Sequence, residues 1–158
     1  MMRPSLAEAF RRIGGAAPEG VDDWWLIGSA AMVLAGFDDV EPEDVDILAS
    51  SATVLRFLER WGIEPGEQRP GEKFRSFPYR RIRLPGCTDI EVMGDLEVLS
   101  DGIWRHVLPR TRRRVLFDGV ALFVPEAAEQ AEIMRLFGRP KDLSRVEVLE
   151  RQDISSKA

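Results

Sequence analysis

Residues 24–49 constrain the fold of this chain more than any other stretch. They begin with the apolar run Trp-Trp-Leu-Ile, which is typical of a short buried strand and which stops at Gly28 and Ser29. The small and apolar residues 30–35 predict a short helix, and a loop rich in Asp, Glu and Pro follows. The stretch closes with residues 44–48, in which acidic and apolar side chains alternate as in a second strand. We therefore expect strand, helix and strand in this order.

Two acidic side chains alternate with apolar ones in the second expected strand. Successive side chains of a strand point to opposite faces, so Asp44 and Asp46 leave one face while Val45 and Ile47 enter the core. Two carboxylates held this close repel each other unless a cation lies between them. Oxygen ligands favour a hard ion such as Mg²⁺, which usually brings phosphate groups with it. The spacing therefore indicates a metal site, the alternative being a solvated strand edge.

The junction between the first strand and the helix offers a place for those phosphates. A helix start exposes unpaired backbone N–H groups and the positive end of the helix dipole, and Gly28 lets the chain approach a ligand closely. Gly28 and Ser29 are therefore candidate phosphate-binding residues. The alternative is that they only cap the helix. The order of the two features along the chain favours the functional interpretation.

This order of an apolar strand, Gly-Ser, a short helix and Asp-x-Asp in a second strand resembles the nucleotidyltransferase superfamily related to DNA polymerase β, and within it the small stand-alone bacterial members. The resemblance implies an α+β fold: a small mixed central sheet with helices packed on one side, then a C-terminal hairpin and two helices. It also implies transfer of a nucleotidyl group from a nucleoside triphosphate, with ATP expected, to a hydroxyl. Asp44 and Asp46 would bind two Mg²⁺ ions, and Gly28 and Ser29 would hold the triphosphate.

The resemblance also implies a third carboxylate on a central strand, which acts as the base toward the attacking hydroxyl and as a metal ligand. Residues 89–93 alternate as a strand and place Asp89 and Glu91 on one face. Glu91, which stands in an apolar-acid-apolar-apolar pattern, is the first choice, and Asp89 is the alternative. Lys141, near the start of the last helix, would reach the phosphates by the same resemblance; otherwise it is a surface lysine.

The remaining patterns outline the rest of the fold. Asp-Gly between two apolar runs predicts a hairpin over residues 115–124. Helices are expected over residues 5–13, 51–61, 95–107 and 126–137 and from residue 141 onward. Between residues 74 and 84, four arginines flank aromatic side chains and face either a triphosphate or solvent: Arg75, Arg80, Arg81 and Arg83.

Composition limits the class of protein. With 158 residues, of which 44% are hydrophobic, we expect one domain over residues 1–152 and a disordered tail over 153–158. The formal net charge of −5 argues against a general affinity for nucleic acid. The single cysteine, Cys87, excludes an internal disulfide and fits a reducing cytoplasm. No apolar run has membrane-spanning length and no signal peptide is recognisable, so a cytoplasmic protein is expected.

Departures from the small members of the superfamily keep a non-catalytic role open. Those members often carry Arg and Thr just before the paired acids, where this chain has Val40 and Pro42, and a further aspartate where Arg145 stands. A binding protein of the same fold, such as the antitoxin-like partner of a toxin protein, is therefore the alternative to an enzyme acting on a hydroxyl of a small molecule or a protein. A calcium site in the acidic loop is a third interpretation, but the loop lacks the ligand spacing of an EF-hand.

Overall fold

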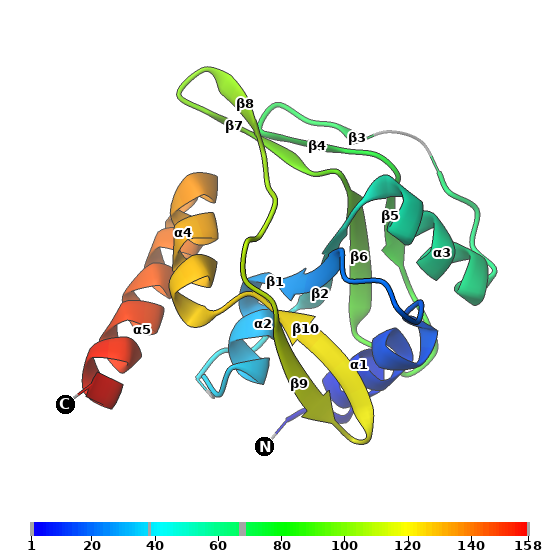
Figure 1. The fold of residues 1–158 in the computed structure, drawn as a ribbon, viewed down its shortest axis with the longest axis horizontal. Coiled ribbons are helices and arrows are strands. Elements are labelled where there is room, and N and C mark those ends of the chain that lie inside the picture. Colours follow the sequence, from blue (N-terminus) through cyan, green and yellow to red (C-terminus); the bar gives the residue numbers. More distant parts are fainter. Residues whose placement is uncertain (1, 38, 67–68, 158) are drawn as a thin grey trace.

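The computed structural model describes residues 2–37, 39–66 and 69–157. Figure 1 shows helices on both sides of a central group of strands. The helices are α1 (Pro4–Ala16), α2 (Gly28–Leu34), α3 (Ser51–Trp61), α4 (Ala127–Phe137) and α5 (Pro140–Lys157). The strands are β1 (Trp24–Ile27), β2 (Asp44–Ala49), β3 (Arg69–Pro70), β4 (Phe74–Ser76), β5 (Tyr79–Ile82), β6 (Asp89–Gly94), β7 (Glu97–Ser100), β8 (Ile103–His106), β9 (Arg113–Phe117) and β10 (Val120–Val124).

The central sheet has the strand order β1-β2-β6-β5. Strands β2 and β6 run parallel, whereas β1 pairs with β2 and β5 pairs with β6 in antiparallel fashion. Strands β9 and β10 form a separate hairpin, and a second four-stranded sheet has the order β3-β4-β7-β8. This mixed sheet with its helices confirms the α+β class predicted from the sequence.

One face of the central sheet forms the main core. The side chains of Val45, Ile47, Ile90 and Val92 are fully buried there, because alternation points every second residue of β2 and β6 toward α1 and α3. Helices α1 and α3 cover this face with apolar stripes, and the β9–β10 hairpin closes it along one edge. Burial of this kind is the dominant stabilising term in a domain of this size.

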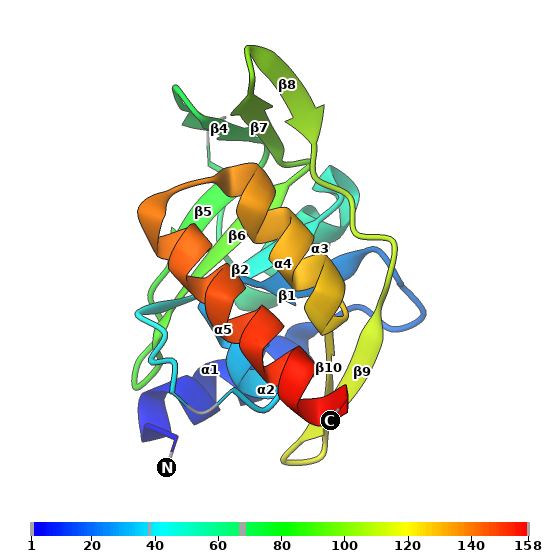
Figure 2. The same cartoon turned by 90° about the vertical axis from the view of Figure 1, so that its left-hand side faces the viewer.

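The opposite face of the same strands is divided into two halves. Its apolar half packs under α4 and comprises Trp25, Ile27, Leu48 and Met93, which contact Ile133 and Phe137 of the helix. Its polar half carries the acidic residues of β2 and β6 and is left open. Figure 2 shows α4 and α5 crossing in front of the strands on this side. The polar half therefore faces the helix pair, and a cavity lies between them.

The C-terminal hairpin forms as predicted. Residues Asp118 and Gly119 connect β9 to β10, and both have positive φ, at 45° and 79°. Two consecutive residues of positive φ are what a type I′ turn requires, which is why Asp-Gly is favoured there. Helix α3 also begins and ends as expected, since the Ser50 side chain accepts a hydrogen bond from the backbone N–H of Thr53 and Gly62 ends the helix with φ 66°.

The prediction of a helix over residues 95–107 is wrong. This segment forms the β7–β8 hairpin, which turns at Asp101 and Gly102, both with positive φ. Val98 is buried while its neighbour Leu99 is partly exposed, which is the alternation of a strand. A second Asp-Gly pair between apolar residues was thus a hairpin signal that the helical interpretation overlooked.

Helix α5 is longer than expected at its C-terminal end. The sequence predicts a disordered tail over residues 153–158, whereas the helix continues to Lys157, and residue 158 lies outside the described residues. The extension has a simple cause, because no Gly or Pro interrupts the sequence after Pro140. Among the helices of the described residues, none is long and apolar enough to cross a lipid bilayer.

Candidate metal and nucleotide site

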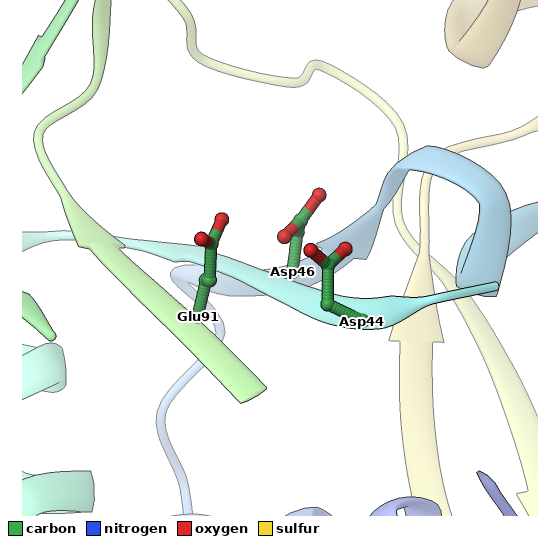
Figure 3. A group of neighbouring side chains, drawn as sticks. All are labelled: Asp44, Asp46 and Glu91. Atoms are coloured by element: carbon green, nitrogen blue, oxygen red, sulfur yellow. The ribbon is translucent and has the colours of Figure 1, made fainter. Parts of the chain in front are cut away.

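Three carboxylates meet on the polar half of the central sheet. The parallel register of β2 and β6 sets Asp46 beside Glu91 and Asp44 beside Asp89. Ligand oxygens of Asp44, Asp46 and Glu91 all lie within 4.8 Å of one another, and Figure 3 shows the three side chains pointing to the same side of their strands. Across the described part of the chain, no other cluster of this kind brings together three possible metal ligands.

The carboxylate of Asp46 is the least satisfied of the three. Its Oδ1 atom is buried and has no hydrogen-bond partner within the described residues. Burial raises the pKa of Asp46 well above its usual range, and the charges of Asp44 and Glu91 raise it further, while Lys141 lowers it. An ionised carboxylate in this position costs free energy unless a cation neutralises it, so the donor set fits a hard divalent ion.

Glu91 is held in place by two donors from strand β5. The hydroxyl of Tyr79 and Nη1 of Arg81 both donate to Glu91 Oε1, at 2.9 Å and 2.7 Å. Nη1 of Arg81 also lies 3.4 Å from Asp44 Oδ2. Both hydrogen bonds end on Oε1 of Glu91. They orient the side chain, and neither Tyr79 nor Arg81 donates to Oε2.

Asp89 has a different environment. Its Oδ2 accepts from Nε of Arg81 at 3.0 Å and from Nε of Arg83 at 3.4 Å. It is not one of the three clustered carboxylates, although it shares their face of the sheet. Of the two acids that the sequence left open, the structure therefore places Glu91 with the paired aspartates and leaves Asp89 bound to arginines.

Gly28 brings the backbone against the carboxylates. It is the first residue of α2 and has φ 74°, which favours glycine. A Cβ atom at this position would lie 3.2 Å from Asp46 Oδ2, so a side chain would crowd the carboxylate. The next residue, Ser29, is buried and lines the same cavity. The two candidate phosphate-binding residues are thus adjacent to the candidate metal ligands.

A cavity of about 270 Å³ lies between this face and the α4–α5 pair. Lys141, in the first turn of α5, and Arg139, which directly precedes this helix, both line the cavity. Arg139 donates hydrogen bonds to the Asp142 carboxylate from Nε at 2.6 Å and from Nη2 at 3.1 Å. The lining residues are Ile27, Gly28, Ser29, Glu41, Glu43, Asp44, Asp46, Glu91, Pro125, Gln130, Ile133, Met134, Phe137, Arg139, Lys141, Asp142 and Arg145.

Sequence reasoning missed several residues of this lining. Glu41 and Glu43 stand in the acidic loop just before β2, whose sequence pattern indicates only a calcium site and not a part of the nucleotide cavity. Gln130 and Arg139 gave no such signal, because only the docking of α4 and α5 onto the sheet brings them to the cavity.

None of the four arginines of residues 74–84 lines the cavity, and they lie in three environments. Arg81 and Arg83 face the acidic residues of β6, as described above. Arg75 instead donates two hydrogen bonds of 3.1 Å to Glu97, and its guanidinium carbon lies 4.1 Å from the centre of the Trp104 ring. It does not line the cavity. Alternation along β5 turns Arg80 to the face of the sheet opposite Arg81.

Comparison with known proteins agrees with this architecture. Neither protein-family profiles nor curated protein sequences yield a match to the chain. The structure is similar to the crystal structure of a putative nucleotidyltransferase from Thermotoga maritima, with a TM-score of 0.75 and 22% identity. The similarity covers 98% of this chain and 96% of that chain. The protein therefore has a nucleotidyltransferase-like fold, as the order of strand, Gly-Ser, helix and Asp-x-Asp predicts.

Proposed function

We propose that this protein is a metal-dependent nucleotidyltransferase, which transfers a nucleotidyl group from a nucleoside triphosphate, with ATP expected, to a hydroxyl. One observation carries the proposal: Asp44, Asp46 and Glu91 converge within 4.8 Å beside a cavity, and Asp46 Oδ1 is buried without a partner. Three such acids on a nucleotidyltransferase-like fold form a donor set that suits Mg²⁺.

The acidic residues have separate roles in this proposal. Asp44 and Asp46 would hold Mg²⁺, with two ions expected, and Glu91 would contribute a further oxygen. Bound Mg²⁺ would neutralise charge on the phosphate groups. Glu91 would also accept the proton of the attacking hydroxyl, and its bonds from Tyr79 and Arg81 fix its orientation for that purpose. Asp89, which is already paired with arginines, would support the site by holding Arg81.

Two parts of the cavity lining supply groups for the triphosphate. Backbone N–H groups of Gly28 and Ser29 at the start of α2 are suited to phosphate oxygens, and Lys141 offers an ammonium group from α5. The charge of Lys141 lowers the pKa of Asp46, which supports a position of Lys141 near the carboxylates. Triphosphate and acids would thus be clamped between the sheet and the two C-terminal helices.

The reaction consists of one displacement at the α-phosphorus. The acceptor oxygen forms a bond to this atom, the bond from phosphorus to the bridging oxygen breaks, and pyrophosphate leaves with the electron pair. The acceptor proton passes to Glu91. Positioning and charge stabilisation supply most of the rate in such transfers, because the protein takes little part in the covalent chemistry.

Calorimetric titration with ATP and GTP, with and without Mg²⁺, tests the proposal. We expect Mg²⁺-dependent binding by the wild type and its loss in the Asp44→Asn, Asp46→Asn double variant. Asp101→Asn is the matched control, because it removes an exposed carboxylate that lies outside both the cavity and the cluster. If the wild type binds neither ATP nor GTP at millimolar concentration, the proposed nucleotidyltransferase activity is excluded.

A protein-binding role is the second candidate, because apolar side chains are exposed outside the cavity. Ile103 on β8 and Leu108 just after it are 56% and 63% exposed. The expected partner is a toxin protein, which would cover them. Size-exclusion chromatography with the product of a neighbouring gene tests this role: a complex that Ile103→Ser and Leu108→Ser dissolve supports it, and separate elution rejects it.

A further inference from the structure

A strongly basic segment lies outside the proposed site. Residues 102–117 carry five arginines, one histidine and no acidic residue, although the chain as a whole has a net charge of −5. This basic segment comprises β8, the connection that follows it and β9, and Figure 2 shows these parts in succession along one side of the structure. None of its residues lines the cavity beside the carboxylates. The proposed chemistry therefore leaves this concentration of charge unexplained.

Three arginines of the basic segment are available to a partner. Arg105, Arg113 and Arg114 are exposed, and within the described residues none of them makes an ion pair. The other two are engaged, since Arg110 pairs with a glutamate of α4 at 2.7 Å and Arg112 donates to backbone carbonyl groups. Unpaired positive charge therefore faces solvent on both strands of the segment.

Exposed aliphatic side chains accompany these arginines. Ile103, Leu108 and Leu116 are each more than half exposed. Alternation along β9 packs Val115 against the main core, so its neighbours Arg114 and Leu116 share the outer face of the strand. The segment contains no lysine. Arginine beside aliphatic side chains, without lysine, is the composition of a protein interface rather than of a solvated surface.

Both strands of the basic segment lie at the edge of a sheet. Among the described strands, β8 pairs with β7 alone and β9 pairs with β10 alone. Each of the two strands therefore presents a row of backbone N–H and C=O groups that no neighbouring strand uses. An extended polypeptide can add to such an edge through main-chain hydrogen bonds, and its side chains then meet those of the edge strand.

Charge decides which polymer suits this edge. A second copy of the chain would bring its own arginines against those of β9, and like charges on paired strands are destabilising. A nucleic acid is disfavoured by the net charge of −5, and it would find no exposed Phe, Tyr or Trp in the basic segment on which a base could stack. An acidic polypeptide matches both the charge and the open edge.

We infer that the basic segment binds an extended acidic polypeptide of a partner protein, which adds as a strand to the edge of β9. This strand carries two of the three unpaired arginines. The added strand places an acidic side chain opposite Arg114 and an apolar one opposite Leu116. The inference rests on the protein-binding role proposed above and specifies the chemistry of its partner. It does not depend on nucleotide binding.

Fluorescence polarisation with labelled synthetic peptides tests the inference. The first probe repeats Glu-Thr-Val-Thr, which as a strand carries Glu and Val alternately on one face. The second repeats Gln-Thr-Val-Thr and lacks the charge, and the third repeats Glu-Gly-Ser-Gly and keeps the charge without strand-forming or apolar residues. We expect the first to bind about tenfold more tightly than either of the others. Equal binding of the first and third probes would indicate charge attraction alone and overturn the inference, as would absence of binding.

Charge reversal on β9 locates the peptide. Arg114→Glu should weaken binding of the first probe about tenfold, because a repulsive cross-strand pair replaces an attractive one. Arg56→Glu makes the same charge change at an exposed arginine of α3 and should leave the affinity nearly unchanged. Leu116→Ser should weaken binding without a change in charge. Because these side chains are exposed, Tm should stay near that of the wild type. Equal losses in Arg114→Glu and Arg56→Glu would overturn the placement on β9.

Three further outcomes are kept apart. A dimer of the protein alone that Arg114→Glu dissociates in light scattering would assign the edge to a second copy and overturn the inference, as would a polyuridine RNA that binds more tightly than the first probe. If the neighbouring gene product forms a complex that Arg114→Glu leaves intact, the protein-binding role stands and only the acidic strand is rejected. If the first probe binds at β9 but no such complex forms, the inference stands and the toxin partner is rejected.

Discussion

Replacing Asp46 by asparagine should stabilise the metal-free protein while abolishing cation binding. The side chain keeps its shape in Asp46→Asn, but it loses a charge that is buried at Oδ1 and repelled by Asp44 and Glu91. Functional sites often hold such unfavourable groups, and removing one raises stability at the expense of activity.

The size of the gain follows from the spacing of the three acids. Two unit charges about 5 Å apart repel by roughly 3 kcal/mol at an effective dielectric constant of 20. Partial exposure of Asp44 and the nearby charges of Arg81 and Lys141 reduce this, so we expect a net gain of about 2 kcal/mol at neutral pH. For a chain of this length, that corresponds to a rise in Tm of about 4–8 °C.

The gain should depend on pH in a defined direction. The raised pKa of Asp46 means that the folded protein keeps a proton which the unfolded chain releases above roughly pH 4. The wild type therefore loses stability relative to Asp46→Asn as the pH rises from that value through the folded pKa. The difference should be small at about pH 4, grow as the pH rises and level off above the folded-state pKa.

Differential scanning calorimetry in EDTA and in excess Mg²⁺ measures the effect. Saturating Mg²⁺ should reverse the order, since a cation at 100 times its Kd adds about 2.7 kcal/mol to the wild type alone. Asp89→Asn is the control and should give no gain, because Asp89 is paired with Arg81 and Arg83. A metal-free Asp46→Asn protein that melts below the wild type at neutral pH would refute the reasoning.

Three other substitutions probe the neighbours of the acids. Gly28→Ala should cost about 1–3 kcal/mol in urea unfolding and weaken ATP binding in calorimetry, because φ is 74° and the new Cβ would lie 3.2 Å from Asp46 Oδ2. Arg81→Met removes a cation that competes for the carboxylates, so the Mn²⁺ affinity measured by calorimetry should rise. Turnover should fall, because Glu91 loses a hydrogen-bond partner. A rise in both quantities or a fall in both would contradict this role of Arg81. Lys141→Ala should raise the Kd for ATP about tenfold with little change in Tm, and equal affinity would remove Lys141 from the phosphate site.

Local patterns predicted the parts of the site that depend on alternation. Because acids and apolar residues alternate in residues 44–48 and 89–93, the face that each side chain takes is determined before the strands pair. The choice between Asp89 and Glu91 was not determined, because it depends on the register of two parallel strands that are far apart in the chain. Register is a property of the assembled sheet, and here it sets Asp46 beside Glu91.

Other features required the tertiary structure outright. Arg139 reaches the cavity because α4 docks on the apolar half of the sheet and the chain then turns into α5. The apolar cluster under α4 combines residues of β1, β2, β6 and α4, which no short stretch of sequence brings together. The β7–β8 hairpin was mistaken for a helix because its apolar residues are too few to distinguish the two periods.

The division of the central sheet into a core face and an acidic face also limits how the chain can change in length. Strand β2 alternates core residues with the two aspartates, so inserting or deleting one residue within it would turn carboxylates into the core and Val45 and Ile47 toward the cavity. Folding and the site would be lost together. The loop before β2 carries no such alternation, so insertions and deletions should be tolerated there while β2 admits only substitutions.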